Sequence, residues 1–237
     1  MLMPEVLSPS SLNTFFKCPR RWLYEHQGKS GVVVDEGAIL FGKVVHSTIE
    51  EYFRKVPETP TIDEIEKIAQ EVFERNGRLV EDKKRFNKIC RNFIEFEINR
   101  VRSWKRYKPL LVEEKLKGGG FVGVIDFYGE ETVIDWKTGN HSLSADSDIL
   151  RQGKIYEMIL RENQRPVKRI IFYSLENKTI VPFPQVSDGW IYREVERMKD
   201  MVEKDQFPAN WSRMCRYCPF QLDCSFEGEC YWRMVDE

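Results

Sequence analysis

Apolar residues in the first half of the chain recur with the period of an α-helix. In residues 41–53 they stand three and four positions apart, which predicts an amphipathic helix that carries His46. A longer block, residues 62–107, repeats this spacing and is interrupted near Asn76 and Gly77, where one helix should end and another begin. The pattern therefore predicts a helical region over residues 40–107.

After Pro109 the pattern changes to short runs typical of strands. Residues 110–116, 121–127 and 132–138 are separated by glycine or acidic turns, which predicts a meander, with a tight turn at the glycines 118–120. A helix over 147–162 and strands over 169–175 and 179–183 should follow. This order predicts a mixed α/β core over residues 109–185, with the helical region inserted before it. Because no linker is evident, we expect one composite domain spanning residues 1–237.

Composition limits the classes of function. The chain has 237 residues, of which 41% are hydrophobic, enough for a substantial core. Lys and Arg number 37 against 38 Asp and Glu, so a positive field toward nucleic acid would have to be local. The longest apolar runs fall far short of the ~20 residues that span a bilayer. With no membrane span and no secretory signal at the N-terminus, we expect a cytoplasmic protein.

Two acids and a lysine share one face of the predicted hairpin. If the turn centres on residues 129–130, Asp126 lies opposite Val133 and diagonal to Asp135, at ~7 Å or less. Because side chains alternate along a strand, Lys137 points to the same face as Asp135. Unpaired charge on an apolar face is costly, and a divalent cation held by the acids would compensate it. The alternative interpretation is an edge hairpin whose charges reach water or form an ion pair.

The sequence around these residues resembles the PD-(D/E)XK nuclease superfamily, in particular its RecB-like branch. That branch is usually recognised by the Asp-Trp-Lys-Thr-Gly stretch, here residues 135–139, and by a helix with Gln152 and Tyr156. Its upstream helix carries a histidine, which His46, four positions after Gly42, matches. The resemblance implies a restriction-endonuclease-like fold, a mixed β-sheet flanked by helices.

The same resemblance implies a role for each site residue. Mg²⁺ or Mn²⁺ would be bound by His46, Asp126 and Asp135, with the backbone carbonyl of Trp136 as a further ligand. Lys137 would orient or deprotonate the attacking water, and Gln152 and Tyr156 would position water or the scissile strand. Glu114, on the preceding strand, is either a supporting acid that acts through water or a solvated charge.

The cysteines indicate a second metal centre. In a reducing compartment, their clustering near the C-terminus favours a metal site over disulfides. The spacing Cys215-x2-Cys218-x5-Cys224 suits one centre, and the fourth ligand is either Cys230, in a local zinc knuckle, or the distant Cys18. The sixth cysteine, Cys90, lies on an apolar helical face and is expected in the core.

Two segments resemble the halves of the iron-sulfur staple of RecB-like nucleases. They are residues 10–24, which include Cys18-Pro19, and residues 215–224. The resemblance implies a [4Fe-4S] cluster that ties residues 1–30 to residues 187–237. The ligands of the cluster would be Cys18, Cys215, Cys218 and Cys224, and Cys230 would not be a ligand. Such staples occur in AddB-type helicase-nucleases and in a small CRISPR-associated exonuclease family that works beside the spacer integrase. The small size of this chain favours the resemblance to the CRISPR-associated family.

A run of basic and aromatic residues suggests where nucleic acid binds. Residues 100–108 contain five cations and two aromatic side chains, which could neutralise phosphates and stack on bases, although a solvated helix face is the alternative. A second basic spot contains Lys17, Arg20 and Arg21.

We therefore expect a metal-dependent DNA exonuclease. The resemblance implies hydrolysis of phosphodiester bonds at single-stranded DNA ends during CRISPR spacer acquisition, with an integrase complex as partner. The alternatives are a stand-alone RecB-like repair exonuclease and a catalytically silent, metal-stabilised nucleic-acid-binding module. The complete set of Asp126, Asp135 and Lys137 argues against the silent module.

Overall fold

The structure is a computed structural model that describes residues 3–32, 36–139 and 144–224. The chain forms two compact units, one from its two ends, Met1–Glu36 with Val186–Glu237, and one from Gly37–Gln185. Each unit is described by itself. Within the described residues, no helix is both long enough and apolar enough to cross a membrane.

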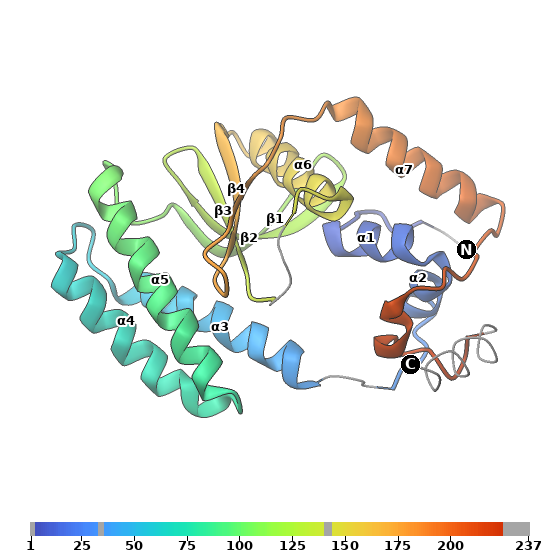
Figure 1. Cartoon of the computed structure of the whole chain (residues 1–237). Helices are drawn as coiled ribbons and strands as arrows, with labels where there is room; N and C mark the ends of the chain where they lie inside the picture. The colour runs from blue at the N-terminus through green and yellow to red at the C-terminus, as the bar shows by residue number, and fades with distance from the viewer. Residues whose placement is uncertain (1–2, 33–35, 140–143, 225–237) are drawn as a thin grey trace. The chain divides into compact units, whose positions relative to one another are not determined.

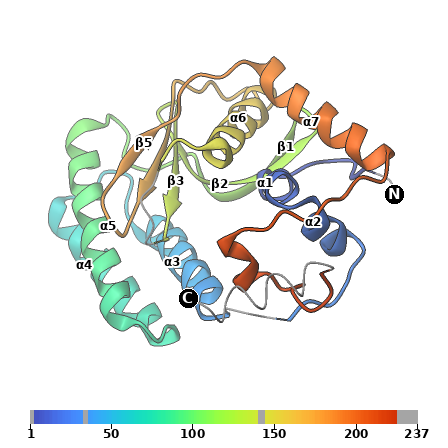
Figure 2. The same cartoon turned by 45° about the vertical axis from the view of Figure 1, so that its right-hand side comes forward.

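A five-stranded mixed sheet forms the centre of the unit Gly37–Gln185 (Figure 1). The strands lie side by side in chain order, and β1 and β5 form the two edges (Figure 2). Neighbours β3 and β4 are parallel, joined by helix α6 as a crossover, and the other pairs are antiparallel. The bounds are β1 Leu111–Gly118, β2 Phe121–Gly129, β3 Thr132–Lys137, α6 Ser147–Glu162, β4 Arg169–Ser174 and β5 Ile180–Pro182. The predicted α/β class and the meander are confirmed.

Two-residue turns set the register of the meander. Gly119 and Gly120, with φ of 63° and 79°, join β1 to β2 as the sequence predicts. Glu130 and Glu131, with φ of 46° and 56°, join β2 to β3. Such turns need a positive φ at both central residues, which matches the twist of the strands.

The second turn lies one residue later than the sequence predicts. Glycine usually occupies positive-φ positions, so the pattern placed the turn on Gly129, whereas Gly129 pairs with Thr132 and ends the strand. Val133 therefore pairs with Tyr128, and the prediction that it lies opposite Asp126 is wrong. Continued along the strands, the observed register places Asp126 across from Asp135.

Helices cover both faces of this sheet (Figure 1). Residues of α3, α4 and α5 form one core cluster with Phe127, Ile134 and Trp136, and residues of α6 form another with Ile125 and Phe172. The bounds are α3 Glu36–Lys55, α4 Ile62–Asn76, a 3-10 turn Gly77–Leu79 and α5 Lys83–Ser103. The predicted break after Asn76 is confirmed, and α5 ends before the predicted residue 107.

The basic and aromatic run at the end of α5 does not form a continuous exposed track. Arg100 is 3% exposed and pairs with buried Glu97 at 2.6 Å, and Tyr107 is 4% exposed. The Trp104 ring centre lies 5.8 Å from that of Phe127, a buried residue of β2. Both aromatic residues of the run therefore pack on the core, from the extended segment that follows α5.

The other unit joins the two ends of the chain. Its helices are α1 Pro9–Lys17, α2 Pro19–His26 and α7 Asp188–Glu203, with a 3-10 turn Arg213–Tyr217. Trp22 is fully buried, and its ring lies 5.4 Å from Phe15 and 6.2 Å from Phe207. Arg20 Nε donates to the Phe207 carbonyl at 2.8 Å, and the Tyr24 hydroxyl donates to the Asp223 carbonyl at 2.9 Å. These contacts hold the two ends of the chain beside each other within this unit.

Candidate active site and cysteine centre

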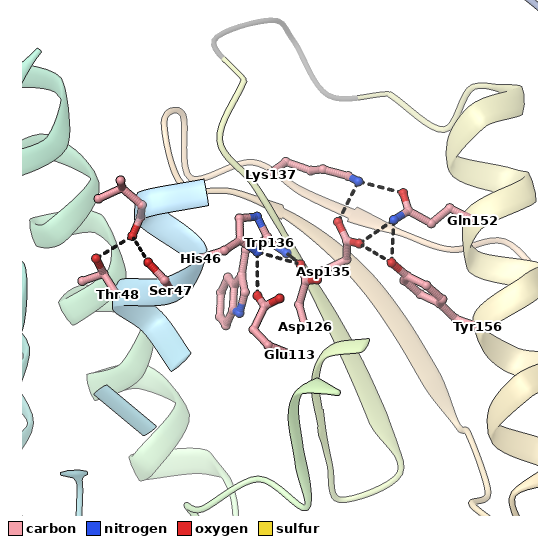
Figure 3. Close-up of polar contacts among 11 residues, drawn as sticks. His46, Ser47, Thr48, Glu113, Asp126, Asp135, Trp136, Lys137, Gln152 and Tyr156 are labelled. Carbon is pink, nitrogen blue, oxygen red and sulfur yellow. Dashed lines mark hydrogen bonds and ion pairs between the residues drawn. The ribbon is translucent and has the colours of Figure 1, made fainter. Parts of the chain in front are cut away.

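Side chains from five elements of the unit Gly37–Gln185 meet at the sheet (Figure 3). The structure brings the sequence-predicted side chains together and adds one acid, Glu113, that the sequence reasoning missed. The set is His46 from α3, Glu113 from β1, Asp126 from β2, Asp135 and Lys137 from β3, and Gln152 and Tyr156 from α6.

His46, Glu113 and Asp126 form one half of the site. His46 Nδ1 lies 2.7 Å from Glu113 Oε1 and 3.6 Å from Asp126 Oδ2. One ligand atom from each residue falls within 4.8 Å of the other two. Among the described residues this is the one such group of three or more histidine, cysteine or acidic side chains. Its nitrogen and oxygen donors suit Mg²⁺ or Mn²⁺.

Glu113, rather than Glu114, is the acid that β1 contributes. Glu114 is exposed and pairs with Ile125 in the sheet, whereas the same register places Glu113 across from Asp126. Glu113 also has a φ of 49°, which is uncommon for a residue other than glycine. The left-handed backbone occurs at the residue whose carboxylate contacts His46, and strained backbone is often found at functional sites.

Asp135 and Lys137 form the other half with two residues of α6. Lys137 Nζ lies 2.8 Å from Asp135 Oδ2 and donates to Gln152 Oε1 at 2.7 Å. Gln152 Nε2 contacts Asp135 Oδ1 at 2.7 Å, and the Tyr156 hydroxyl donates to the same oxygen at 3.1 Å. In this arrangement Gln152 and Tyr156 fix the orientation of the acid and the lysine.

A glycine makes room for this network. An added Cβ at Gly123, on β2, would lie 3.2 Å from the ring of Tyr156. The missing side chain thus lets Tyr156 approach the sheet closely enough to reach Asp135. Its hydroxyl keeps its proton for this bond, because burial, and then the charges of Asp135 and Asp126, raise the pKa of Tyr156 well above its usual value.

Negative charge at the site is only partly balanced by the side chains. Burial, and then the neighbouring Asp135 carboxylate, raise the pKa of Asp126 well above its usual value. Burial alone would lower the pKa of His46, but the hydrogen bond with Glu113 and the charges of Asp126, Glu113 and Asp135 raise it to about 9. The acids therefore strongly favour a cation between them.

The residues fit a divalent cation on two observations. Asp135 Oδ2 is buried and, among the described residues, accepts no hydrogen bond of good geometry, although Lys137 Nζ is close. The backbone N–H of Trp136 donates a hydrogen bond to Asp126 Oδ2 at 2.9 Å, which fixes the orientation of this carboxylate. A bound cation would satisfy the first oxygen and compensate the buried acids. The predicted role of the Trp136 carbonyl stays a prediction.

Four cysteines lie around one hollow in the unit formed by the chain ends. The hollow has a volume of about 40 Å³, and its lining includes Arg21, Tyr24 and Trp211. All four predicted cluster ligands also line it: Cys18, Cys215, Cys218 and Cys224. Cys230 lies outside the described residues. Cys90 is 9% exposed in the other unit, and burial raises the pKa of its thiol to about 12, consistent with a core position.

The four thiols are not gathered as tightly as the ligands of one bound zinc ion would be. Four sulfurs at ~2.3 Å from one zinc would lie within ~4 Å of each other. Among the described residues, no three cysteine sulfurs all fall within 4.8 Å of one another. The backbone N–H of Ser212 also points at Cys215 Sγ, at 3.4 Å. N–H groups directed at sulfur tune iron-sulfur centres.

Comparison with known proteins identifies the family. The sequence profile of the PD-(D/E)XK nuclease superfamily matches residues 6–225. None of the curated proteins compared with the chain matches it. One solved structure, described as "Crystal structure of SSO0001", is 14% identical over 95% of this chain and 88% of that chain, with a TM-score of 0.43. The profile match covers most of the chain and both halves of the site, and the chain therefore belongs to the PD-(D/E)XK nuclease superfamily.

Proposed function

We propose that this protein is a metal-dependent exonuclease that hydrolyses phosphodiester bonds at the ends of single-stranded DNA. Membership of the superfamily supports a metal-dependent nuclease. The observation that carries the proposal is the meeting of His46, from α3, with Glu113, Asp126, Asp135 and Lys137 of the sheet. A catalytically silent module would have no need to bury this much negative charge.

The side chains divide the work of hydrolysis between them. The divalent metal, when bound by His46, Glu113, Asp126 and Asp135, supplies positive charge for a phosphate oxygen and activates water. Lys137, with a side chain 29% exposed, is open to solvent and can orient the attacking water toward phosphorus. Gln152 holds the lysine through Oε1, so the ammonium group is already in position when the strand enters.

The finer parts of the proposal come from the sequence resemblance. We infer a [4Fe-4S] cluster on Cys18, Cys215, Cys218 and Cys224, and a role in CRISPR spacer acquisition beside an integrase complex. The hollow lined by these four cysteines, and the hydrogen bonds between the chain ends, support the cluster. The cluster would hold the chain ends together and takes no part in the hydrolysis derived above.

The activity is tested with end-labelled single-stranded DNA and Mn²⁺. Linear strands should be degraded and circular strands should resist, because an exonuclease needs an end. Lys137→Ala should reduce kcat by at least about 100-fold, the scale of a group that acts on the nucleophile. Lys115→Ala is the matched control, an exposed lysine on β1, and should cleave like the wild type. Equal cleavage by Lys137→Ala and wild type would refute the assignment.

The cluster is tested on protein purified without oxygen. Iron and acid-labile sulfide in equal amounts near four per chain, with broad visible absorbance, are expected. One zinc per chain without sulfide would instead indicate a mononuclear site and would contradict the proposed cluster.

A further inference from the structure

A concave basic surface lies at the turn end of the β2–β3 hairpin. A hollow of about 710 Å³, within the unit Gly37–Gln185, is lined by five cations from two segments of the chain. We name it the basic basin; its cations are Lys105, Arg106, Lys108, Lys168 and Arg169. The first three precede β1, and the last two lie at the start of β4. Distant parts of the sequence thus supply one positive surface.

The two acids of the basic basin are already engaged. Glu130 Oε1 accepts from the backbone N–H of Arg106 at 2.5 Å, and Glu131 forms an ion pair with Lys168. The N–H that binds Glu130 belongs to the backbone, so the guanidinium of Arg106 is not used for it. Glu58 lies 3.9 Å from Lys108, so five cations face three acids and the basin stays positive in a chain whose net charge is −1. A local excess of this kind attracts a polyanion.

The basin is held by a rigid base. Arg100, Trp104 and Tyr107 anchor the segment before β1 in the core, so the neighbouring Lys105, Arg106 and Lys108 are presented from fixed backbone. Thr132, next to Glu131, pairs with Arg169 at the start of β4, which fixes the second segment. A pre-organised set of cations loses less conformational entropy on binding than mobile side chains.

The position of the basin relates it to the active site. Thr132 begins β3 and Lys137 ends it, so the basin lies about 16 Å along the strand from the catalytic lysine at 3.3 Å per residue. Because helices cover both faces of the sheet, a single strand with its scissile phosphate at Lys137 has to run around the sheet to the basin, which takes several nucleotides.

We propose that the basic basin binds the phosphate backbone of the same single-stranded DNA, several nucleotides away from the scissile bond. This rests on the proposed function. The contact is electrostatic and independent of sequence, because cations neutralise phosphates whatever bases the strand carries. It would hold a long strand on the enzyme between successive cleavages.

The test removes three cations whose side chains have no ion pair in the described structure. The triple variant Lys105→Ala, Arg106→Ala and Arg169→Ala keeps the backbone N–H that binds Glu130. Binding of a fluorescent 20-nucleotide strand is measured by anisotropy over a salt series, with Ca²⁺ in place of Mn²⁺ to prevent cleavage. The affinity should fall about tenfold, and the log–log salt slope should flatten by about 2, at 0.7 per phosphate contact.

Two comparisons make the result specific. A double variant at exposed cations of the helical region, Lys67→Ala with Arg78→Ala, should keep the wild-type affinity and slope. A trinucleotide is too short to reach the basin from Lys137, so the triple variant should cleave it with unchanged kcat and KM.

The outcomes separate this inference from the proposed function. If the wild type cleaves single strands but the triple variant binds the long strand with unchanged affinity and slope, the basin is not a DNA surface, and a protein partner becomes its occupant. If the triple variant also loses trinucleotide cleavage, the cations act at the site itself and the inference is wrong. If the wild type neither binds nor cleaves single strands, both proposals are overturned.

Discussion

At the residue scale, the two neighbouring glutamates of β1 make a matched pair. Glu113 contacts His46 at 2.7 Å, whereas Glu114 is exposed. Glu113→Gln removes a charge from the group of metal ligands and should weaken Mn²⁺ binding about 10–100-fold, the usual effect of losing a supporting ligand. Isothermal titration with Mn²⁺, and cleavage rates over a Mn²⁺ series, measure this loss.

Glu114→Gln is the control, and its Mn²⁺ affinity should match that of the wild type. Saturating Mn²⁺ should restore part of the activity of Glu113→Gln, since the change acts on metal affinity. The same Mn²⁺ dependence in both variants would show that Glu113 serves only to orient His46.

The side chains that meet at the candidate site could be predicted from the sequence, except for this acid. Asp126, Asp135, Lys137 and the Gln152–Tyr156 helix stand in motifs whose spacing carries their meaning. The clue to Glu113 was also present, because a two-residue turn at Gly119 and Gly120 fixes the β1–β2 register and places position 113 across from position 126. The left-handed backbone of Glu113 could not be predicted from the sequence, since such a conformation depends on tertiary contacts.

At the element scale, α5 holds the chain directly after β3 and β4, beside Lys137, the lysine proposed to be catalytic. Asn92 Nδ2 donates to the Leu175 carbonyl at 2.7 Å, and the N–H of Leu175 donates to the Lys137 carbonyl at 2.9 Å. Arg85 donates to the carbonyl of Thr138, directly after Lys137, and to Glu176 Oε2 at 2.9 Å. Helix α5 therefore fixes the backbone directly after Lys137 and the backbone of the neighbouring strand that bonds to it.

Arg85→Ala should lower kcat and leave KM for DNA nearly unchanged, because it loosens the backbone that aims Lys137 without touching the strand. It should also lower the free energy of unfolding by about 2 kcal/mol, since Glu176 loses a charged hydrogen bond. Steady-state kinetics and urea unfolding measure the two effects. Arg91→Ala, an exposed arginine on the same helix, is the control; if it changes kcat equally, α5 has no specific positioning role.

The charge of Glu176 makes stability depend on pH. Burial alone would raise the pKa of Glu176, but hydrogen bonds from Lys88 and Arg85 lower it below its ordinary value of 4.5. A lowered folded-state pKa stabilises the protein above pH 4.5, and the contribution is lost as the pH falls through the lowered value. Wild type should thus be more stable than Glu176→Gln at pH 7, with the difference vanishing in acid.

Urea unfolding from pH 7 down into the acid range tests this dependence. Glu95→Gln is the matched control, since the Glu95 side chain is 58% exposed in its pair with Lys178. An exposed pair contributes about 0–1 kcal/mol, so Glu95→Gln should differ little from wild type at any pH. A constant difference between wild type and Glu176→Gln across the range would mean that shape, and not charge, matters at Glu176.

The elements follow from local patterns, but their ends and the burial of charged residues do not. Periodicity located α3, α4 and α6, because each buries one face, and short apolar runs bounded by turn residues located the strands. It could not show that Arg100 turns inward, since that depends on Glu97 lying three residues earlier and on aromatic rings from β2 and α3 around the guanidinium. A charged residue is predicted to be exposed to solvent unless a buried partner for its charge is known.

At the scale of the whole molecule, the chain ends form a unit that encloses the sheet-bearing segment in sequence. Cys18 lies on one end and Cys215, Cys218 and Cys224 on the other. A cluster on all four would close a loop of most of the chain, which restrains the unfolded state by roughly 3 kcal/mol more than a short loop among the C-terminal cysteines.

Cys18→Ser should therefore lose iron and lower the thermal stability of the end unit, while the unit Gly37–Gln185 keeps its own core. Hydrogen exchange should show faster exchange in α1, α2 and residues 205–224, with β2, β3 and α6 still protected. Cys90→Ser, a buried cysteine in the other unit, should keep its iron and controls for loss of any thiol. The two candidate ligand sets differ only in their fourth member, Cys18 or Cys230, so Cys230→Ser is the deciding variant and should keep its iron. If metal is instead lost in Cys230→Ser and kept in Cys18→Ser, the site is a local four-cysteine site. The chain ends would then be held by side-chain packing alone.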